Sequence, residues 1–97
     1  MPKVELIVHA QALPGKEDEL RKELYAMLQP THAEDGCEFY RLFESAKPGH
    51  FFLHELWTTE EALDAHRRMP HLLKLKQAIA PLMERPLDGH SITEVPE

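Results

Sequence analysis

Alternating apolar and polar positions predict a strand at the start of the chain. Over residues 4–12 every second side chain is apolar, which is the period of a strand with one buried face. Two more segments with strand character, 37–45 and 51–58, are joined by a loop that contains the turn sequence KPG, so we expect a hairpin. A last strand is predicted over residues 89–95.

Helical spacing replaces this alternation between the first two strands. A Pro-Gly turn at residues 14–15 precedes an acidic first turn and an apolar stripe, which together predict a helix. The stripe consists of Leu20, Leu24, Met27 and Leu28. We expect Pro30 to kink or interrupt this helix and Gly36 to follow its end, because proline lacks a helical donor and glycine accepts a left-handed conformation.

A second helical region follows the third strand. Thr58 and Glu61 match the capping box S/T-x-x-E, so a helix is predicted to begin there and to continue to about Arg68. Pro70 suits the first position of another helix, which we expect Pro81 to bend or end. The apolar stripe of that helix consists of Leu72, Leu75, Ile79 and Leu82 or Met83.

The resulting order, β-α-β-β-α(α)-β, is that of the ferredoxin-like split β-α-β fold. It predicts a single α+β domain over residues 1–97, with an antiparallel sheet and its helices on one side. In the third strand one face carries Phe51, Leu53, Glu55 and Trp57, and the other carries Phe52, His54 and Leu56. Neither face is polar enough to lie against water alone. One should pack on the helices and the other on a partner chain, so we expect a homodimer.

Composition limits the partners and the location. The formal net charge of −6 opposes binding to nucleic acid, because phosphate contacts require a basic surface. No apolar run approaches the roughly 20 residues of a membrane span, and the first residues lack a secretory-signal pattern, so we expect a cytoplasmic protein with no membrane partner. The single cysteine excludes an intrachain disulfide and a cysteine-based zinc site.

Candidate chemistry is concentrated in HELWTTEEALDAHRRMPH, residues 54–71, which contains the only tryptophan and three of the seven histidines. Glu55 would be costly to bury without a partner. It is either a general base with a raised pKa or a member of a structural ion pair or hydrogen bond. His66 lies on the apolar face of its predicted helix, either as a core side chain or as a group that exchanges protons at the mouth of a cavity.

The remaining histidines are less well placed for catalysis. His54 should point away from Glu55, whereas His9, whose facing the sequence does not fix, is a candidate for lining the same cavity. His71 lies at a helix start and is a candidate substrate-binding residue. Because His66 and His71 are separated by Pro70 and do not share one helix face, we expect no metal site.

Several segments, in order, resemble the antibiotic biosynthesis monooxygenase (ABM) family, which includes small quinol monooxygenase-like proteins. They are ALPGKEDEL, EDGCEFYRL, HELWTTEEALDAH, MPHLLKL and APLMERP, and they span nearly the whole chain. The resemblance implies a dimeric α+β barrel with an aromatic residue, here Trp57, lining the substrate cavity. The alternative role of Trp57 is packing in the dimer core. Leu53, on the same strand face, is a further candidate for substrate binding. Haem-degrading proteins of this fold carry a ligand histidine on the helix after the one with His66. This chain has Lys76 or a neighbour there, so we do not expect haem.

The same resemblance implies oxygenation without a metal or flavin cofactor, and the sequence contains no GxGxxG or P-loop motif. A deprotonated phenol, anthrone or quinol gives an electron to O2 directly, so the protein supplies a dry pocket and a base. We expect a cofactor-independent monooxygenase of a small aromatic, phenolic or quinol-like substrate, with His66 and Glu55 as catalytic candidates. Two alternatives stay open: a proton-transfer enzyme such as an isomerase of a small carbonyl compound, and a non-catalytic dimeric binding or stress-associated protein.

Overall fold

The computed structural model describes residues 2–97, which form four strands, four α-helices and one short 3-10 helix. In chain order the elements are β1 (Val4–Gln11), α1 (Glu17–Ala26), α2 (Leu28–His32), β2 (Cys37–Glu44), β3 (His50–Trp57), α3 (Glu60–Arg67), α4 (Pro70–Ile79), the 3-10 helix η1 (Ala80–Leu82) and β4 (Asp88–Ile92). None of the helices within this described range is long and apolar enough to cross a membrane.

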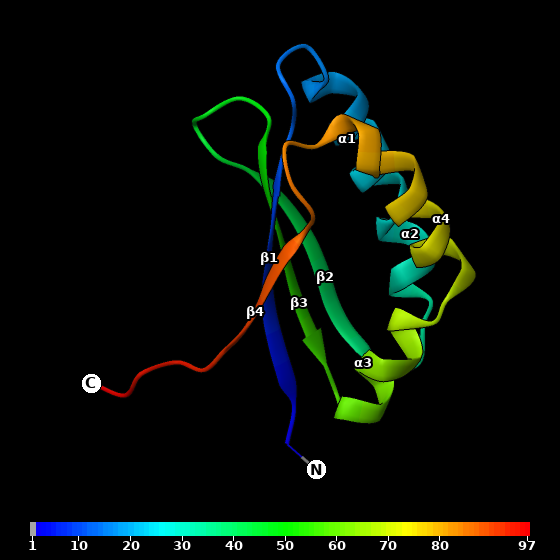
Figure 1. Cartoon of the computed structure of the whole chain (residues 1–97). Helices are drawn as coiled ribbons and strands as arrows, with labels where there is room; N and C mark the ends of the chain where they lie inside the picture. The colour runs from blue at the N-terminus through cyan, green and yellow to red at the C-terminus, as the bar shows by residue number, and fades with distance from the viewer. Residues whose placement is uncertain (1) are drawn as a thin grey trace.

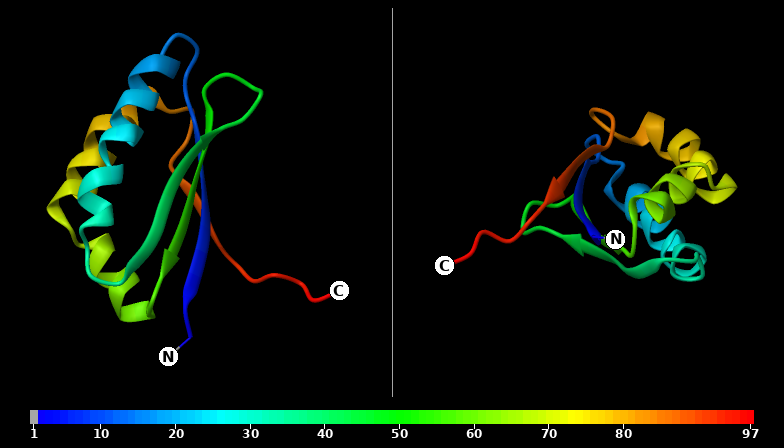
Figure 2. Two further views of the ribbon diagram at one scale, coloured as in Figure 1. Left: turned by 180° about the vertical axis from the view of Figure 1, so that it is seen from behind. Right: turned by 90° about the horizontal axis from the view of Figure 1, so that it is seen from below.

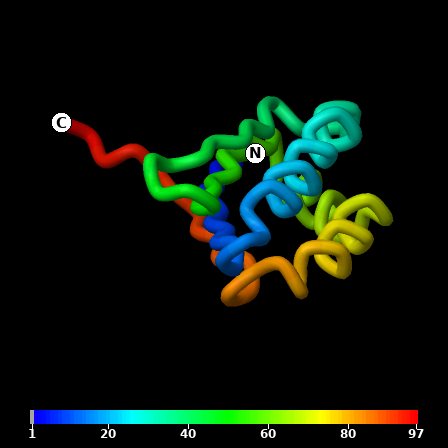
Figure 3. Tube along the Cα trace, turned by 90° about the horizontal axis from the view of Figure 1, so that it is seen from above, coloured from blue at the N-terminus to red at the C-terminus, as the bar shows by residue number. Residues whose placement is uncertain are grey.

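The four strands form one antiparallel sheet in the order β2-β3-β1-β4. The helices lie as a layer on one side of the sheet, and the C-terminal segment after β4 leads away on the other side (Figures 1, 2 and 3). This arrangement confirms the predicted ferredoxin-like α+β fold, including the hairpin between β2 and β3.

The face of the sheet toward the helices forms the core. On β3 the four residues predicted to share a face are all buried: Phe51, Leu53, Glu55 and Trp57. The helices cover them with the predicted stripes, buried at Leu20, Leu24, Met27, Leu72, Leu75, Ile79 and Leu82. The period of a strand and the period of a helix therefore identified the core positions without knowledge of the fold.

No helix formed by residues 2–97 lies against the opposite face of the sheet (Figures 1 and 2). We call this the outer face. The side chains of Phe52, His54 and Leu56 are only half-buried here, and Phe43, which pairs with Phe52 across the strands, is 49% exposed. The sequence predicted that this second face of β3 is not polar enough to lie against water alone, and its half-buried apolar side chains agree with that prediction.

The start of α3 differs from the prediction by one residue. The N-cap is Thr59, whose side chain accepts a hydrogen bond from the backbone N–H of Ala62. Thr58 is still held beside β3, because its backbone N–H donates to the carbonyl of Gly36. The predicted capping box of Thr58 and Glu61 is therefore wrong, although the helix is capped by a threonine.

The first helical region is interrupted just ahead of Pro30, which agrees with the prediction that this proline kinks or interrupts it. The break between α1 and α2 falls at Met27, and Pro30 lies in the first turn of α2. A residue of the first turn has no intrahelical use for its N–H, so proline is tolerated there. The last strand is shorter than predicted and ends at Ile92.

Gly36 brings the chain that enters β2 directly against α3. Its φ is +84°, a left-handed conformation, and a Cβ at this position would lie 2.5 Å from the Cβ of Ala62 and 2.8 Å from Oγ1 of Thr58. Only glycine fits both the conformation and the space. The contact holds the preceding residues, including Glu34, next to α3.

Candidate functional site

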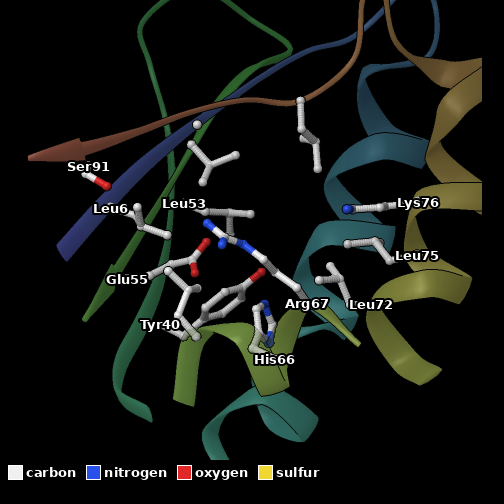
Figure 4. A pocket seen from close by; sticks show the side chains of 14 residues that line it. Leu6, Tyr40, Leu53, Glu55, His66, Arg67, Leu72, Leu75, Lys76 and Ser91 are labelled. Atoms are coloured by element: carbon white, nitrogen blue, oxygen red, sulfur yellow. The ribbon is translucent and has the colours of Figure 1, made fainter. Parts of the chain in front are cut away.

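A cavity of about 290 Å³ lies between the inner face of the sheet and helices α3 and α4 (Figure 4). Its walls are largely aliphatic and include Leu6, Leu53, Leu63, Leu72 and Leu75. The titratable side chains that line it are Tyr40, Glu55, His66, Arg67 and Lys76. An apolar cavity of this size with a few convergent polar groups is the usual form of a small-molecule site.

Glu55 projects from β3 into the wall of this cavity and is only 4% exposed. Its Oε1 accepts a hydrogen bond of 3.0 Å from Nε1–H of Trp57. Burial raises the pKa of Glu55, while the Trp57 hydrogen bond and the positive charge of Arg67 act in the opposite direction. Figure 4 shows Arg67 reaching from α3 toward Glu55. Glu55 thus combines the two features that its sequence position left as alternatives, a raised pKa and a structural hydrogen bond.

His66 is held on the inner side of α3 by Glu34, which lies between α2 and β2. The Nδ1 of His66 is 2.8 Å from Oε2 of Glu34, and the two side chains are 4% and 5% exposed. Because a carboxylate only accepts, the neutral imidazole carries its proton on Nδ1 and keeps a lone pair on Nε2. Burial lowers the pKa of His66, outweighing the opposite effect of Glu34, so the ring is neutral near pH 7.

Two aromatic rings pack against His66. The ring of Trp57 lies 4.6 Å from it and the ring of Tyr40 lies 5.7 Å from it, measured between centroids. The pKa of Tyr40 is raised by burial and by the charges of Glu55 and Glu34, so its hydroxyl stays protonated and can donate a hydrogen bond.

Arg67 and Lys76 bring positive charge to the same cavity. Figure 4 shows them approaching from α3 and α4, respectively. Fixed cations in a largely apolar cavity stabilise negative charge that develops on a bound molecule. The cavity therefore contains a neutral base, a phenolic donor and two cations.

Only some of the residues that the sequence proposed for the site line the cavity. Leu53, Glu55 and His66 line the cavity. Trp57 is fully buried behind Glu55 and does not form part of the wall, because its indole is packed between the sheet and α3. The indole therefore acts on the cavity through its hydrogen bond to Glu55.

His9 does not line the cavity, because it points to the outer face. Its ring lies 4.7 Å from that of Phe52 and 6.0 Å from that of His90. His54 also lies on the outer face, as predicted, and its Nε2 is 2.6 Å from Oε2 of Glu5. The position of His9 in the alternation of β1, opposite Phe52 in the ladder, fixes this facing.

His71 does not line the cavity either, but it does meet His66, contrary to the expectation from their spacing. The Nε2 of His71 is 2.6 Å from Oε2 of Glu34, the same oxygen that contacts His66. The rule that metal ligands lie at i and i+4 applies within one helix. Here α3 ends at Arg67 and a new helix, α4, begins at Pro70, so His66 and His71 lie on different helices. Two short helices therefore place both imidazoles on one carboxylate.

Four residues at the site, Glu34, Tyr40, Arg67 and Lys76, were not predicted as site residues from the sequence. Tyr40 faces Glu55 across the β2–β3 ladder, so the alternation in β2 would have found it. Arg67 and Lys76 gave no distinguishing signal, because charged side chains on helices usually face solvent. Glu34 gave no local signal, since it reaches His66 only through the close approach at Gly36.

A family model for antibiotic biosynthesis monooxygenase matches residues 4–78, from β1 into α4. The chain belongs to the ABM family. The range that matches the ABM model contains all of the titratable cavity residues and Glu34. The sequence resemblance to this family is thereby confirmed.

Relatives of this ABM chain agree over most of its length. It is 40% identical over 84 residues to the protein named "Putative monooxygenase Rv0793" from Mycobacterium tuberculosis, covering 87% of this chain and 83% of that protein. The solved structure of Rv0793 has a TM-score of 0.90 at 36% identity, covering 99% of this chain and 98% of that one. The crystal structure of PA3566 from Pseudomonas aeruginosa also gives 0.90, at 26% identity, with 99% and 97% covered.

Proposed function

We propose that this ABM chain is a cofactor-independent monooxygenase that oxidises a small aromatic, phenolic or quinol-like substrate with O2. The observation that carries the proposal is the buried His66, which lines an apolar cavity and has its Nδ1 occupied by Glu34. This arrangement leaves Nε2 as the nitrogen available to a bound molecule. The name of the Mycobacterium tuberculosis relative, "Putative monooxygenase Rv0793", supports the reaction class.

The reaction begins with transfer of a proton from the activated position of the substrate to Nε2 of His66. The substrate anion then gives one electron to O2, and the resulting radical pair joins to form a C–O bond. The peroxide takes the proton back from His66 and loses water to leave a carbonyl group. One oxygen atom enters the product and the other leaves as water, so a CH2 group and O2 yield C=O and H2O without an external reductant.

The other polar groups of the cavity stabilise the negative charge of the intermediates. Tyr40 keeps its proton and can donate to an oxyanion, and Arg67 and Lys76 supply positive charge. The aliphatic walls hold an aromatic ring and limit water, which would otherwise solvate the anion and weaken these interactions. Leu53 and Leu72, from opposite sides of the cavity, form part of the surface for the ring.

One observation favours a proton-transfer enzyme, such as an isomerase, as a second candidate. Glu55 has a raised pKa and His66 a lowered one, and both line the same cavity. Environments that push two titratable groups in opposite directions are typical of a paired acid and base. The same pair would move a proton within a small carbonyl compound without using O2.

The proposal includes a homodimer with its two sheets face to face. The outer face presents half-buried Phe52 and Leu56 beside the exposed Phe43, with no helix to cover them. Packing this surface against a second copy would remove it from water, which is the main driving force for association. The cavity lies on the other side of the sheet, so a dimer leaves it open to the substrate.

The test is oxygen incorporation by chelator-treated protein. We would incubate it with a panel of phenols, anthrones and quinols under ¹⁸O2 and analyse the product by mass spectrometry. The proposal predicts one labelled oxygen atom in the product, at a rate that chelation does not reduce. Turnover of a carbonyl compound without O2 uptake would support the second candidate, and binding without turnover of either class would indicate a non-catalytic protein.

A further inference from the structure

Glu34, His66 and His71 converge on one point behind the cavity. They come from the α2–β2 connection, from α3 and from the first turn of α4. One ligand atom of each lies within 4.8 Å of the others. The two imidazoles contact the same carboxylate oxygen, Oε2 of Glu34, at 2.8 Å from His66 Nδ1 and 2.6 Å from His71 Nε2.

The second oxygen of Glu34 is left without a partner. Oε1 is buried and, among residues 2–97, no hydrogen bond reaches it, although the side chain is only 5% exposed. A buried carboxylate oxygen normally has a hydrogen-bond or metal partner, because losing its hydration is costly. The hydrogen bonds of the cluster therefore leave part of the charge of Glu34 unmatched.

We propose that Glu34, His66 and His71 form a binding site for a divalent transition-metal ion of the Zn²⁺ type. Imidazole and carboxylate are ligands that such ions accept, and three protein ligands leave a further position for water. A tetrahedral ion with bonds of about 2.0–2.2 Å holds its ligand atoms about 3.3–3.5 Å apart. To reach this spacing, each imidazole nitrogen would move slightly away from Oε2 of Glu34, which it contacts at 2.8 or 2.6 Å. The two nitrogens, which lie within 4.8 Å of each other, would move toward each other.

An ion reaches this point from the side away from the substrate cavity. His71 is 27% exposed, whereas the side chains of His66 and Glu34 are almost fully buried. His71 also lines a surface depression of about 350 Å³ between the α1–α2 region and α4. Glu23 and Lys74 lie in the same depression with opposite charges. The ion and the substrate therefore approach His66 from opposite sides.

Metal binding changes what His66 offers to the cavity. An ion on Nδ1 takes the place of the proton there, and the neutral imidazole then carries its proton on Nε2. Nε2 becomes a donor and can no longer accept a proton. This consequence rests on the proposed function, and it makes the ion a reversible inhibitor of proton abstraction by His66.

The site is tested by direct binding to the purified full chain, stripped of metal. We would titrate it with Co²⁺, followed by visible absorption, and with Zn²⁺, followed by calorimetry. We expect one ion per chain and a cobalt absorption band typical of low coordination number. His71→Gln should weaken binding by more than roughly 100-fold, since even groups that only orient a ligand contribute roughly 10–100-fold. Because the side chain of His71 is 27% exposed, we expect this variant to fold.

The control is His90→Gln on the outer face, where His90 contacts Asp88 but not the cluster. It should bind both ions as the wild type does. Absence of stoichiometric binding, or equal affinity in wild type and His71→Gln, would overturn the site. Glu34→Gln provides a second ligand variant that keeps the side-chain shape and should also lose the ion.

The inhibitory consequence has a separate readout. Zn²⁺ should reduce turnover of the wild type but not of His71→Gln, which keeps His66. Binding without any effect on turnover would overturn the inhibition and leave the site in place. If no substrate is turned over at all, the proposed function fails, while the binding titration still decides whether the metal site exists.

Discussion

At the residue scale, His66 owes its chemistry to neighbours with opposite effects. Burial disfavours its charged form, and Glu34 favours it while fixing the proton on Nδ1. The effect of burial is the larger of the two, so the pKa of His66 is lowered and the neutral ring is favoured. A neutral imidazole with one nitrogen occupied is suited to accepting a proton at the other.

The lowered pKa of His66 predicts the pH dependence of turnover. The base must be unprotonated, so in metal-free protein kcat/KM should fall on the acid side at a pH below the ordinary histidine value of about 6.5. Glu34 raises the pKa of His66, so Glu34→Gln should move this acid limb to still lower pH and also reduce the maximum rate. A pH–rate profile of both proteins measures this. An acid limb that stays in place in Glu34→Gln would contradict the pairing.

Trp57 should affect the stability of the protein and the pKa of Glu55 in separable ways. Trp57→Ala removes a fully buried indole and should lower the free energy of unfolding by about 3–5 kcal/mol. Trp57→Phe keeps most of the packing but removes the Nε1–H donor to Glu55, so it should cost less stability and raise the pKa of Glu55 further. Thermal unfolding and titration of Glu55 by NMR distinguish the two effects. An unchanged Glu55 pKa in Trp57→Phe would show that the hydrogen bond has no influence.

The sequence revealed only part of the site at this scale. Glu55 and His66 stood out because each places a titratable group on an apolar face with a regular period. Glu34 did not, because its contact with His66 joins positions far apart in the chain and depends on packing at Gly36. His71 was misjudged because its helix begins independently of the helix that carries His66.

At the scale of elements, the close packing of Gly36, just before β2, against α3 sets the position of Glu34. Gly36→Ala would introduce a Cβ 2.5 Å from that of Ala62 and should displace the connection. Gly15→Ala is a matched control, since its φ is also left-handed, at +87°, but nothing lies within 4 Å. Both variants lose about 1–2 kcal/mol from the conformation, and the overlap should cost Gly36→Ala about 1–3 kcal/mol more. Equal losses in chemical denaturation would contradict the close approach.

The type of each element was predictable from the sequence, because helices and strands bury side chains at different periods. The residues at which elements begin and end were less predictable. The stripe of α4 and the alternation of β3 were confirmed residue by residue. The cap of α3 moved from Thr58 to Thr59 because Thr58 is still bonded to the strand region through Gly36. The start of α3 is therefore set by the hydrogen bond between Thr58 and Gly36, which are far apart in the chain. The local sequence around Thr58 gives no information about this contact.

At the scale of the whole molecule, the outer face of the sheet predicts association. Sedimentation equilibrium should show a dimer at micromolar concentration, because a second copy would cover Phe43 and Phe52. Phe52→Glu should give a folded monomer, since it places a charge in the centre of the contact. A control change at Lys22, on the helical side, should leave the dimer intact. A stable wild-type monomer would contradict this interpretation of the outer face.

The most direct test of the central claim is O2 consumption by metal-free wild type and His66→Gln with one active substrate. Glutamine can satisfy Glu34 but cannot accept the substrate proton as a base. The rate should fall by roughly 10²–10⁴-fold while the variant stays folded and still binds the substrate. Near-wild-type O2 consumption by His66→Gln, with an unchanged pH profile, would show that His66 is not the base.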